Sequence, residues 1–338
     1  MLSILVKSKF KKLQNIVILR LSKMNVFDTK AKVKQRNRAS LWPESENYEY
    51  LYEEMAYRMA DRIYDIKRCF NVAVDFGCGR GFLSKHLTSD YVRYLIQCDT
   101  CENDLRGSDE ENLDVANSKI LLEPETFPFK ENSIDLVVSS LSMHWINNLP
   151  GIMKQINNAL KPDGCFLGVL FGGETLYQLR SAFYLADNER IGGFGPHVSP
   201  FVDSRDLGGL LNSSGFNLLT IDMDEITVHF PSVFELMHDL RGMGNSNCTW
   251  SRVNHLSKDV MFAVAAIYDE MYSISTSDST ESSNIPEKCR EMSRPIPATF
   301  QLLHFIAWKP HPSQQKPAKR GSATVSFKDL GKVTTESP

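Results

Sequence analysis

The hydrophobic residues in the first half of the chain form short continuous blocks, separated by stretches in which apolar residues recur at helical spacing. A block without polar alternation is typical of a strand buried on both faces of a parallel sheet. The strands expected from these blocks lie at residues 72–76, 94–98, 120–122, 135–139 and 166–170. The helices expected around them lie at 48–64, from Gly81 to about residue 89, and at 152–160, before a turn at 161–164. This alternation predicts an α/β fold.

The pattern changes after Gly173. A Gly/Pro-rich loop is expected at 191–200. The other elements expected in this half are helices at 174–190 and 203–211, and strands at 218–230 and 300–308. Roughly 70 residues separate the last two strands, which is too long for a simple connection in a compact domain. Residues 231–298 are therefore expected to be a helical insertion between these strands.

The insertion is expected to hold helices at 233–243 and 258–272 and a Ser/Thr-rich, disordered stretch at 273–293. One apolar face is expected on its first helix, made by Phe234, Met237, Leu240 and Met243. That face either packs on the sheet edge or belongs to a lid over a ligand cleft, and the sequence leaves both interpretations open. A lid would bring three polar side chains toward a bound substrate: Arg241, Asn245 and Asn247.

Composition narrows the class of protein. Hydrophobic residues make up 42% of the chain and charged residues 23%, which excludes global disorder and a fibrous repeat. Seven cysteines in 338 residues are too few for a disulfide scaffold. The net charge of −3 is unevenly spread, because residues 1–38 hold eleven Lys or Arg and one acid, and the remainder carries −13. A basic arm on an acidic body argues against nucleic-acid binding.

The first 23 residues contain no acid and interleave Lys and Arg with Leu, Ile, Val and Phe. This composition is typical of an amphipathic mitochondrial transit peptide, whereas a secretory signal would have an uninterrupted apolar block. A basic tail without a targeting role is the alternative. After the transit peptide at 1–23, the expected organisation is an N-terminal helical segment at 24–65, a ligand-binding domain at 66–230 and 299–309, the insertion at 231–298, and a mobile tail at 310–338.

The sharpest local motif begins at Asp75, at the end of the first expected strand, and contains Gly77, Gly79 and Gly81. Glycines there let the backbone turn tightly and let a ligand approach it closely. Dinucleotide sites have the spacing G-x-G-x-x-G, but here the sixth position is Phe82. This departure and the preceding acid favour S-adenosylmethionine, whose ammonium Asp75 could hold. The alternative is a tight turn without a ligand.

Asp99 follows the second expected strand, about 20 residues after the glycines, where an acid can accept both ribose hydroxyls of a nucleoside. Together with the glycines it predicts a nucleoside-binding crevice at the carboxyl ends of the strands, where ligands bind in open α/β sheets. Three neighbouring residues complete this part of the candidate cofactor site: Cys78, Thr100 and Ser139.

Residues 122–129 and 132–139, LEPETFPF and NSIDLVVS, resemble the D-A-E-x-L-P-F…F-D segment of class I methyltransferases. The resemblance implies that Glu123 and Pro124 contact adenine, although this chain has Glu where the pattern has Asp and Pro where it has Ala. The expected fold is therefore an α/β, class I methyltransferase, Rossmann-like doubly wound sheet with a helical insertion between the last two strands.

More specific segments extend this resemblance over residues 25 to about 332. They lie at 27–28, 35–39, 75–81, 140–145, 171–176, 193–197, 242–247 and 320–325, with the sequences FD, QRNRA, DFGCGRG, SLSMHW, FGGETL, GFGPH, GMGNSN and RGSATV. Together they resemble the mitochondrial complex I assembly factor 5 family. The glycine motif is generic to methyltransferases, whereas the later motifs are not.

The family resemblance implies a methyltransferase fold that binds S-adenosylmethionine and hydroxylates an arginine on an iron–sulfur subunit of complex I during assembly. It also implies other assembly factors as partners, no nucleic acid, and a location in the mitochondrial matrix, at the matrix face of the inner membrane. Two alternatives stay open. The chain could be an ordinary S-adenosylmethionine-dependent methyltransferase, or a non-catalytic assembly chaperone.

Three side chains are candidates for substrate contacts. His144, after the fourth expected strand, could move a proton or orient an arginine and is the candidate catalytic residue. Trp145 could stack on a guanidinium, and His197, on the Gly/Pro-rich loop, could line the cleft. The alternatives are a packed pair at a strand end and a surface histidine. No His is followed two residues later by Asp or Glu, a common spacing in non-haem iron sites, so no metal site is predicted.

Overall fold

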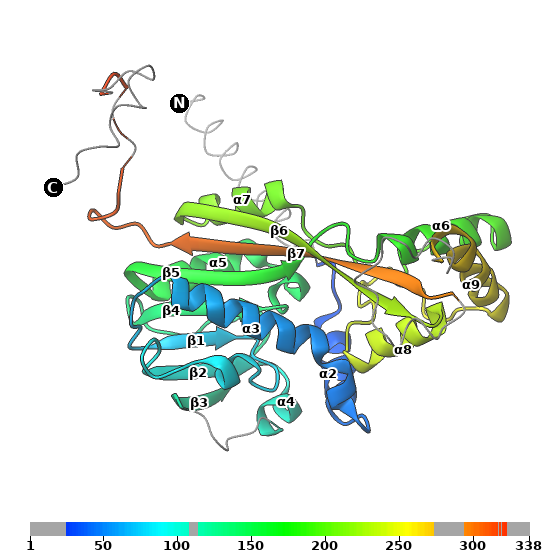
Figure 1. Cartoon of the computed structure of the whole chain (residues 1–338), viewed down its shortest axis with the longest axis horizontal. Helices are drawn as coiled ribbons and strands as arrows, with labels where there is room; N and C mark the ends of the chain where they lie inside the picture. Colours follow the sequence, from blue (N-terminus) through cyan, green and yellow to red (C-terminus); the bar gives the residue numbers. More distant parts are fainter. Residues whose placement is uncertain (1–24, 108–113, 274–293, 317, 319, 323–338) are drawn as a thin grey trace, which may run out of the picture.

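The computed structural model describes residues 25–107, 114–273, 294–316, 318 and 320–322 (Figure 1). The predicted transit peptide at 1–23 lies outside the described residues, as do 274–293 of the Ser/Thr-rich stretch and most of the C-terminal tail. Among the described residues, no helix has both the length and the apolar character needed to cross a membrane.

One mixed sheet of seven strands forms the centre of the molecule, in the order β3-β2-β1-β4-β5-β7-β6. Its strands are β1 Ala73–Phe76, β2 Tyr94–Asp99, β3 Ala116–Leu121, β4 Ile134–Ser140, β5 Leu160–Phe171, β6 Asn217–Phe230 and β7 Ile296–Trp308. The first five are parallel, and β7 is antiparallel to both β5 and β6. The chain order reverses between β1 and β4, which makes the carboxyl ends of these strands the expected ligand crevice.

Both faces of the sheet are covered, as the continuous apolar strands predict. The α-helices are α2 Thr29–Ser40, α3 Tyr50–Asp65, α4 Glu102–Arg106, α5 Leu149–Ala159, α6 Tyr177–Arg190, α7 Ser204–Ser213, α8 Val233–Gly242 and α9 Lys258–Tyr272. Successive residues of β1 point to opposite faces of the sheet. Ala73 packs in the hydrophobic cluster that contains residues of α3, and Val74 packs in the one that contains residues of α5. Figure 1 shows α3 across one face of the sheet and α5 behind it.

The structure differs from the sequence prediction after Gly81. The expected helix there is a single 3-10 turn, η2 Leu83–His86. Contacts with α3 end it, because the His86 carbonyl accepts a hydrogen bond from the Tyr64 hydroxyl and Leu87 takes an extended conformation. The other two 3-10 turns are η1 Ser45–Tyr48 and η3 Met143–Trp145.

The predicted turn at 161–164 lies inside β5, which begins at Leu160. A register shift between Ile134 and Leu136 marks an irregularity in the β4–β5 ladder, and Asp163 has a φ of 62°. The helix breakers therefore produce a bulged strand end instead of a separate turn. The Lys161 ammonium fixes this segment by binding the Asp135 carboxylate at 2.8 and 2.9 Å.

Helix α2 occupies a region whose polar and basic composition shows no clear apolar period. The Asp28 carboxylate begins the helix by accepting a hydrogen bond from the Ala31 amide at 3.0 Å, which satisfies a free N-terminal donor. Lys32 and Ala39 are its buried residues. Figure 1 shows α2 beside α4 and α8, so the helix lies at the end of the sheet where the crevice is expected.

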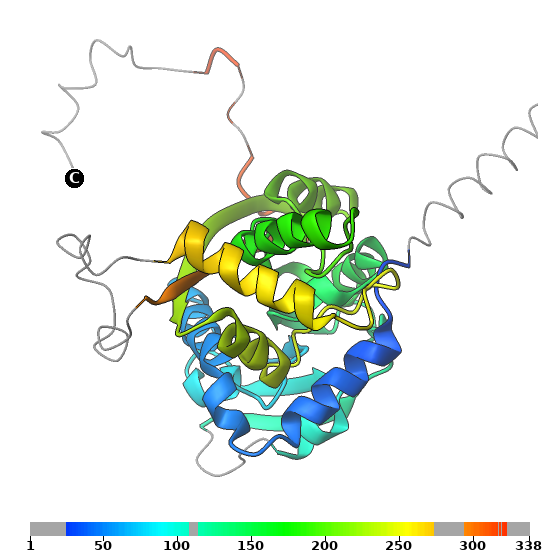
Figure 2. The ribbon, with the colours of Figure 1, turned by 90° about the vertical axis from the view of Figure 1, so that its right-hand side faces the viewer.

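The insertion between β6 and β7 contains α8 and α9, which Figure 2 shows close together on one side of the molecule. Helix α8 buries Val233, Leu236 and Leu240. The expected apolar face was wrong in one member, because Phe234 is 38% exposed and contacts the edge of Phe262. The buried face of α8 is therefore rotated toward Val233 and Leu236.

Candidate functional site

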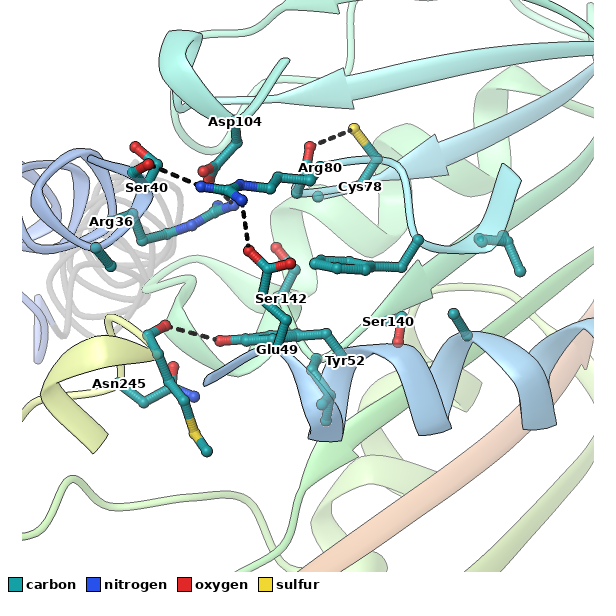
Figure 3. Close-up of a pocket in the computed structure, with 18 of the residues that line it drawn as sticks. Arg36, Ser40, Glu49, Tyr52, Cys78, Arg80, Asp104, Ser140, Ser142 and Asn245 are labelled. Atoms are coloured by element: carbon teal, nitrogen blue, oxygen red, sulfur yellow. Dashed lines mark hydrogen bonds and ion pairs between the residues drawn. The ribbon is translucent and has the colours of Figure 1, made fainter. Parts of the chain in front are cut away.

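Two adjoining open cavities of about 800 and 640 Å³ lie at the carboxyl ends of β1, β2 and β4. Cavity A is lined by residues that include Tyr52, Asp75, Gly79, Asp104, Ser140 and Asn245. Cavity B is lined by residues that include Phe76, Asp99, Thr100, Leu122, Glu123 and Pro124. The residues common to both walls are Arg36, Gly77, Ser142 and Trp145. Figure 3 shows the side chains around cavity A.

The glycine turn forms one wall of cavity A. Gly77, Gly79 and Gly81 all have positive φ, in the left-handed region that favours glycine. A Cβ on Gly77 would meet the Ser142 hydroxyl oxygen at 2.0 Å, so only glycine fits at this approach. Cys78 is buried between these glycines and lines the same cavity, and burial raises the pKa of its thiol well above the ordinary value.

Asp75 places a carboxyl group in the wall of cavity A. The residue is 1% exposed, and its Oδ1 has no hydrogen-bond partner among the described residues. Burial, together with the charge of Asp99, raises its pKa to about 8. A buried carboxylate without a partner is costly, and a cation beside it would remove that cost. The side chain therefore suits the ammonium of an amino acid.

Asp99, at the end of β2, is held by backbone and side-chain donors. Its carboxylate oxygens accept hydrogen bonds from the amides of Gly79 and Cys101, both at 2.9 Å. The same oxygens accept two hydrogen bonds from the Arg36 guanidinium, at 2.8 and 2.9 Å. The sequence pattern indicated Asp99 but not Arg36, which comes from α2, because the segment 35–39 carried only a family resemblance.

The Arg36 guanidinium also binds Asp104, whose Oδ2 lies 2.8 Å from its Nη2. Burial lowers the pKa of Arg36, but the charges of Asp99 and Asp104 outweigh it and raise that pKa well above the ordinary value. Burial raises the pKa of Asp104, and Arg36 partly opposes the rise. Asp104 begins no recognisable motif, so nothing in the sequence pattern could have indicated its role.

Cavity B brings together most of the predicted nucleoside contacts. Thr100, Glu123 and Pro124 line it with the apolar side chains of Phe76 and Leu122. Ser139 does not line either cavity. It is 1% exposed, and its hydroxyl donates to the Phe76 carbonyl at 2.8 Å, so it links β4 to β1 instead of facing a ligand.

Trp145, the predicted stacking residue, lines both cavity A and cavity B. One face of its ring is covered by the Lys32 ammonium, 3.4 Å from the ring centroid. Lys32 also donates to the carbonyls of Gly244 and Ser246, at 3.0 Å each. Burial lowers the pKa of Lys32 to about 7. A guanidinium could stack on that face of Trp145 only after Lys32 had moved.

His144, the candidate catalytic residue, lies away from both cavities. Its ring is surrounded by Trp145, Phe171 and Phe201, and both of its nitrogens lack a hydrogen-bond partner among the described residues. Burial, followed by the charge of Lys32, lowers its pKa well below the ordinary value. The side chain belongs to the aromatic packing that supports Trp145 and lines neither cavity A nor cavity B.

His197 also lies away from cavities A and B. Its Nε2 lies 2.7 Å from Oδ2 of Asp187, and its ring stacks on Phe183 with the centroids 4.1 Å apart. Its side chain is only 7% exposed. The residue therefore fixes the 191–200 loop against α6, and it is neither a surface histidine nor part of the cleft wall.

The loop after α8 reaches cavity A, but only one of the three polar residues predicted for a lid lines it. That residue is Asn245, which lines the cavity together with Met243. Arg241 instead lies over the Trp42 ring, 5.1 Å from its centroid. Asn247 fixes the loop, since its side-chain oxygen accepts a hydrogen bond from the Ser199 hydroxyl and its side-chain nitrogen donates one to the Pro196 carbonyl. Among the described residues, no group of three or more His, Cys, Asp or Glu could hold a metal ion.

Comparison with known proteins agrees with this geometry. Residues 74–168, which contain β2, β3, β4 and the glycine turn, match the model of a methyltransferase domain. The chain is 50% identical over 310 residues to "Arginine-hydroxylase NDUFAF5, mitochondrial" of Mus musculus, covering 92% of this chain and 85% of that protein. The chain belongs to the NDUFAF5 family. Its member in Dictyostelium discoideum is 38% identical over 330 residues, covering 91% of this chain and 71% of that protein.

Membership of the NDUFAF5 family confirms the family predicted from sequence, and the sheet topology with the domain match confirms the class I methyltransferase fold. The chain is also similar to the solved structure of the YcgJ protein from Bacillus subtilis, with a TM-score of 0.47 and 12% identity. That similarity covers 74% of this chain and 97% of the other.

Proposed function

We propose that this member of the NDUFAF5 family is an S-adenosylmethionine-binding protein-arginine hydroxylase of the mitochondrial matrix. It acts during the assembly of complex I, on an arginine of an iron–sulfur subunit at the matrix face of the inner membrane, alongside other assembly factors. The observation that carries the proposal is the 50% identity to a named arginine hydroxylase over 85% of that protein's length.

The residues around cavities A and B fit S-adenosylmethionine. The unpartnered Asp75 carboxylate suits its ammonium, and the positive-φ glycines let the ligand touch the backbone. The Asp99 carboxylate suits the ribose hydroxyls, and Glu123 and Pro124 border the space for adenine. When bound, this cofactor would supply a sulfonium centre.

A substrate arginine needs anionic or aromatic partners, and cavity A supplies both. Asp104 and Glu49, which bind Arg36 and Arg80 in the structure, provide carboxylates in its wall, while Trp145 provides a ring. The role proposed for these residues is to bind and orient the guanidinium beside the cofactor. His144 is proposed to act through Trp145, because it packs against that ring and reaches neither cavity A nor cavity B.

The test is mass spectrometry of the complex I iron–sulfur subunits from cells with and without this protein. The proposal expects one arginine to carry the mass of one extra oxygen atom only when the protein is present. Cells that express Asp75→Asn should show the unmodified mass. Arg38→Met is the matched control, because Arg38 is exposed on α2 and lies outside the walls of cavities A and B.

The main alternative is methyl transfer, which the match of residues 74–168 to a methyltransferase domain favours. The same mass measurement separates the two activities, since a methyl group on a complex I subunit would replace the hydroxylase proposal. A chaperone without catalysis would leave the mass unchanged, and the Asp75→Asn protein would still support assembly of the complex.

A further inference from the structure

The strongest unexplained contact in the site is the bidentate ion pair between Arg36 and Asp99. Nη1 of Arg36 lies 2.8 Å from Oδ1 of Asp99, and Nη2 lies 2.9 Å from Oδ2. Asp99 is 2% exposed, and the Arg36 side chain is 22% exposed. The pair is therefore built into the interior of the site, where charge-assisted hydrogen bonds are strong.

The donors around Asp99 are of two kinds. The backbone amides of Gly79 and Cys101 each donate to one carboxylate oxygen and fix the orientation of the group. Arg36 donates one N–H to each oxygen from the side of the cavities. Because a carboxylate has about four acceptor positions, these donors fill all of them.

A ribose diol bound by Asp99 would donate one O–H to each of the same two oxygens. We infer that Arg36 is an intramolecular competitor of the cofactor's ribose, so that the guanidinium must leave Asp99 before the hydroxyls can bind. This inference rests on the cofactor part of the proposed function. It adds a gate, carried by α2, that the proposed function does not contain.

The structure gives the released guanidinium a second partner. Nη2 of Arg36 also lies 2.8 Å from Asp104, whose carboxylate lines cavity A. Arg36 itself is in the walls of both cavities, so it lies at their junction, as Figure 3 shows for cavity A. A shift toward Asp104 keeps the buried cation paired and frees the outer positions of Asp99.

Helix α2 carries a second cation on the same face. Lys32 precedes Arg36 by four residues, and side chains at this spacing are neighbours on a helix. Lys32 covers Trp145 and binds the carbonyls of Gly244 and Ser246. The helix that blocks the ribose position is therefore tied to the loop that borders cavity A, so opening the gate involves the same part of the molecule as substrate access.

The gate should lower the apparent affinity for any ligand that needs Asp99. If one molecule in ten is open without ligand, the apparent affinity is about tenfold weaker than the intrinsic one. Removing the competing guanidinium should restore that factor. If Arg36 instead contacted the ligand directly, removal of its guanidinium would weaken binding, so the direction of the change in affinity distinguishes the two roles.

The experiment measures adenosine binding to the full chain by calorimetry. Arg36→Met should bind adenosine about tenfold more tightly than the unaltered chain, and Arg36→Lys should be intermediate, because an ammonium cannot engage both carboxylate oxygens as a guanidinium does. The matched control is Arg38→Met, which removes the same charge from an exposed position of α2. Circular dichroism and thermal unfolding check that each variant folds.

Unchanged or weaker adenosine binding by a folded Arg36→Met protein overturns the gate and leaves the cofactor assignment intact. An equally large gain in affinity for 2′,3′-dideoxyadenosine, which lacks both ribose hydroxyls, also overturns it. The Arg36 side chain would then exclude the nucleoside by its size and would not compete with the hydroxyls for the Asp99 oxygens. A gain confined to the diol supports the inference. If neither protein binds adenosine or S-adenosylmethionine, the cofactor assignment fails and the gate fails with it.

Discussion

At the scale of single residues, the site depends on two buried carboxyl groups that differ in their hydrogen-bond partners. Asp75 has a free Oδ1, whereas Asp99 is fully bonded to Gly79, Cys101 and Arg36. Their positions at the carboxyl ends of β1 and β2 place them on one edge of the sheet, so the two carboxyl groups can act on different parts of one ligand. The difference in their partners makes their contributions separable by experiment.

Asp75→Asn should weaken S-adenosylmethionine binding by about tenfold or more, because a charge-assisted hydrogen bond contributes about 1.5–3 kcal/mol. Adenosine, which lacks the ammonium, should bind this variant as it binds the unaltered chain. Calorimetry with both ligands makes the comparison. An equal loss for the two ligands would show that Asp75 supports the fold of the site and does not recognise the ammonium.

Asp75 should also make stability depend on pH. Its pKa rises from 3.8 to about 8 on folding, so its contribution is fully present below about pH 4 and is lost as the pH rises through 8. Each pKa unit corresponds to about 1.4 kcal/mol. Asp75→Asn should therefore gain up to a few kcal/mol relative to the unaltered chain between about pH 5 and pH 9. Urea unfolding at both pH values measures this gain, and a pH-independent difference would contradict it.

At the scale of elements, continuous apolar blocks predicted β1, β2, β4 and β5, because strands buried on both faces must be apolar throughout. The edge strand β3 is largely exposed and begins at Ala116, four residues before the expected start. The apolar pattern gave no bounds for α2 within the helical segment expected at 24–65, because this helix is held by the cap at Asp28 and by the contacts of Lys32 and Arg36. No period of apolar residues could indicate such a helix. The 3-10 turn η2 was missed for a related reason, since contacts with α3 decide where it ends.

The same distinction applies to the site. Asp75, the glycines and Asp99 were predicted because each lies at or just after the carboxyl end of a strand, and the spacing brings them to one edge. Arg36 and Asp104 were not, because their roles depend on how α2 and α4 pack. His144 and His197 were chosen for their residue type and for their places after a strand and on a loop, but the structure gives their rings aromatic and carboxylate neighbours away from the cavities.

Helix α8 allows the lid interpretation to be tested with two substitutions. Phe234→Asp should leave S-adenosylmethionine affinity and stability almost unchanged, since Phe234 is 38% exposed and lines neither cavity A nor cavity B. Leu236→Ala should destabilise the chain by about 2–5 kcal/mol, because Leu236 is fully buried. Urea unfolding and calorimetry distinguish the two. A selective loss of product formation in Phe234→Asp would restore Phe234 to a substrate-contacting face.

At the scale of the whole molecule, most of the excess positive charge and most of the described fold lie in different parts of the chain. The sheet, the cavities and the covering helices lie in residues 25–107, 114–273 and 294–316, whereas most of the positive charge excess lies before residue 39. Part of that excess belongs to α2, where Lys32 and Arg36 serve the site. The rest lies in residues 1–23, which are predicted from their composition to be a transit peptide.

The targeting role predicts that residues 1–23 fused to a fluorescent reporter carry it into mitochondria, because an acid-free amphipathic segment is drawn inward by the negative potential of the matrix. The control fusion replaces Lys7, Lys9, Lys11 and Lys12 with Glu, which keeps the apolar residues and reverses the charge. It should remain in the cytosol. Import is measured by co-localisation and by protease protection in isolated mitochondria. If both fusions stay outside, another segment directs the protein; if both enter, charge is not the signal.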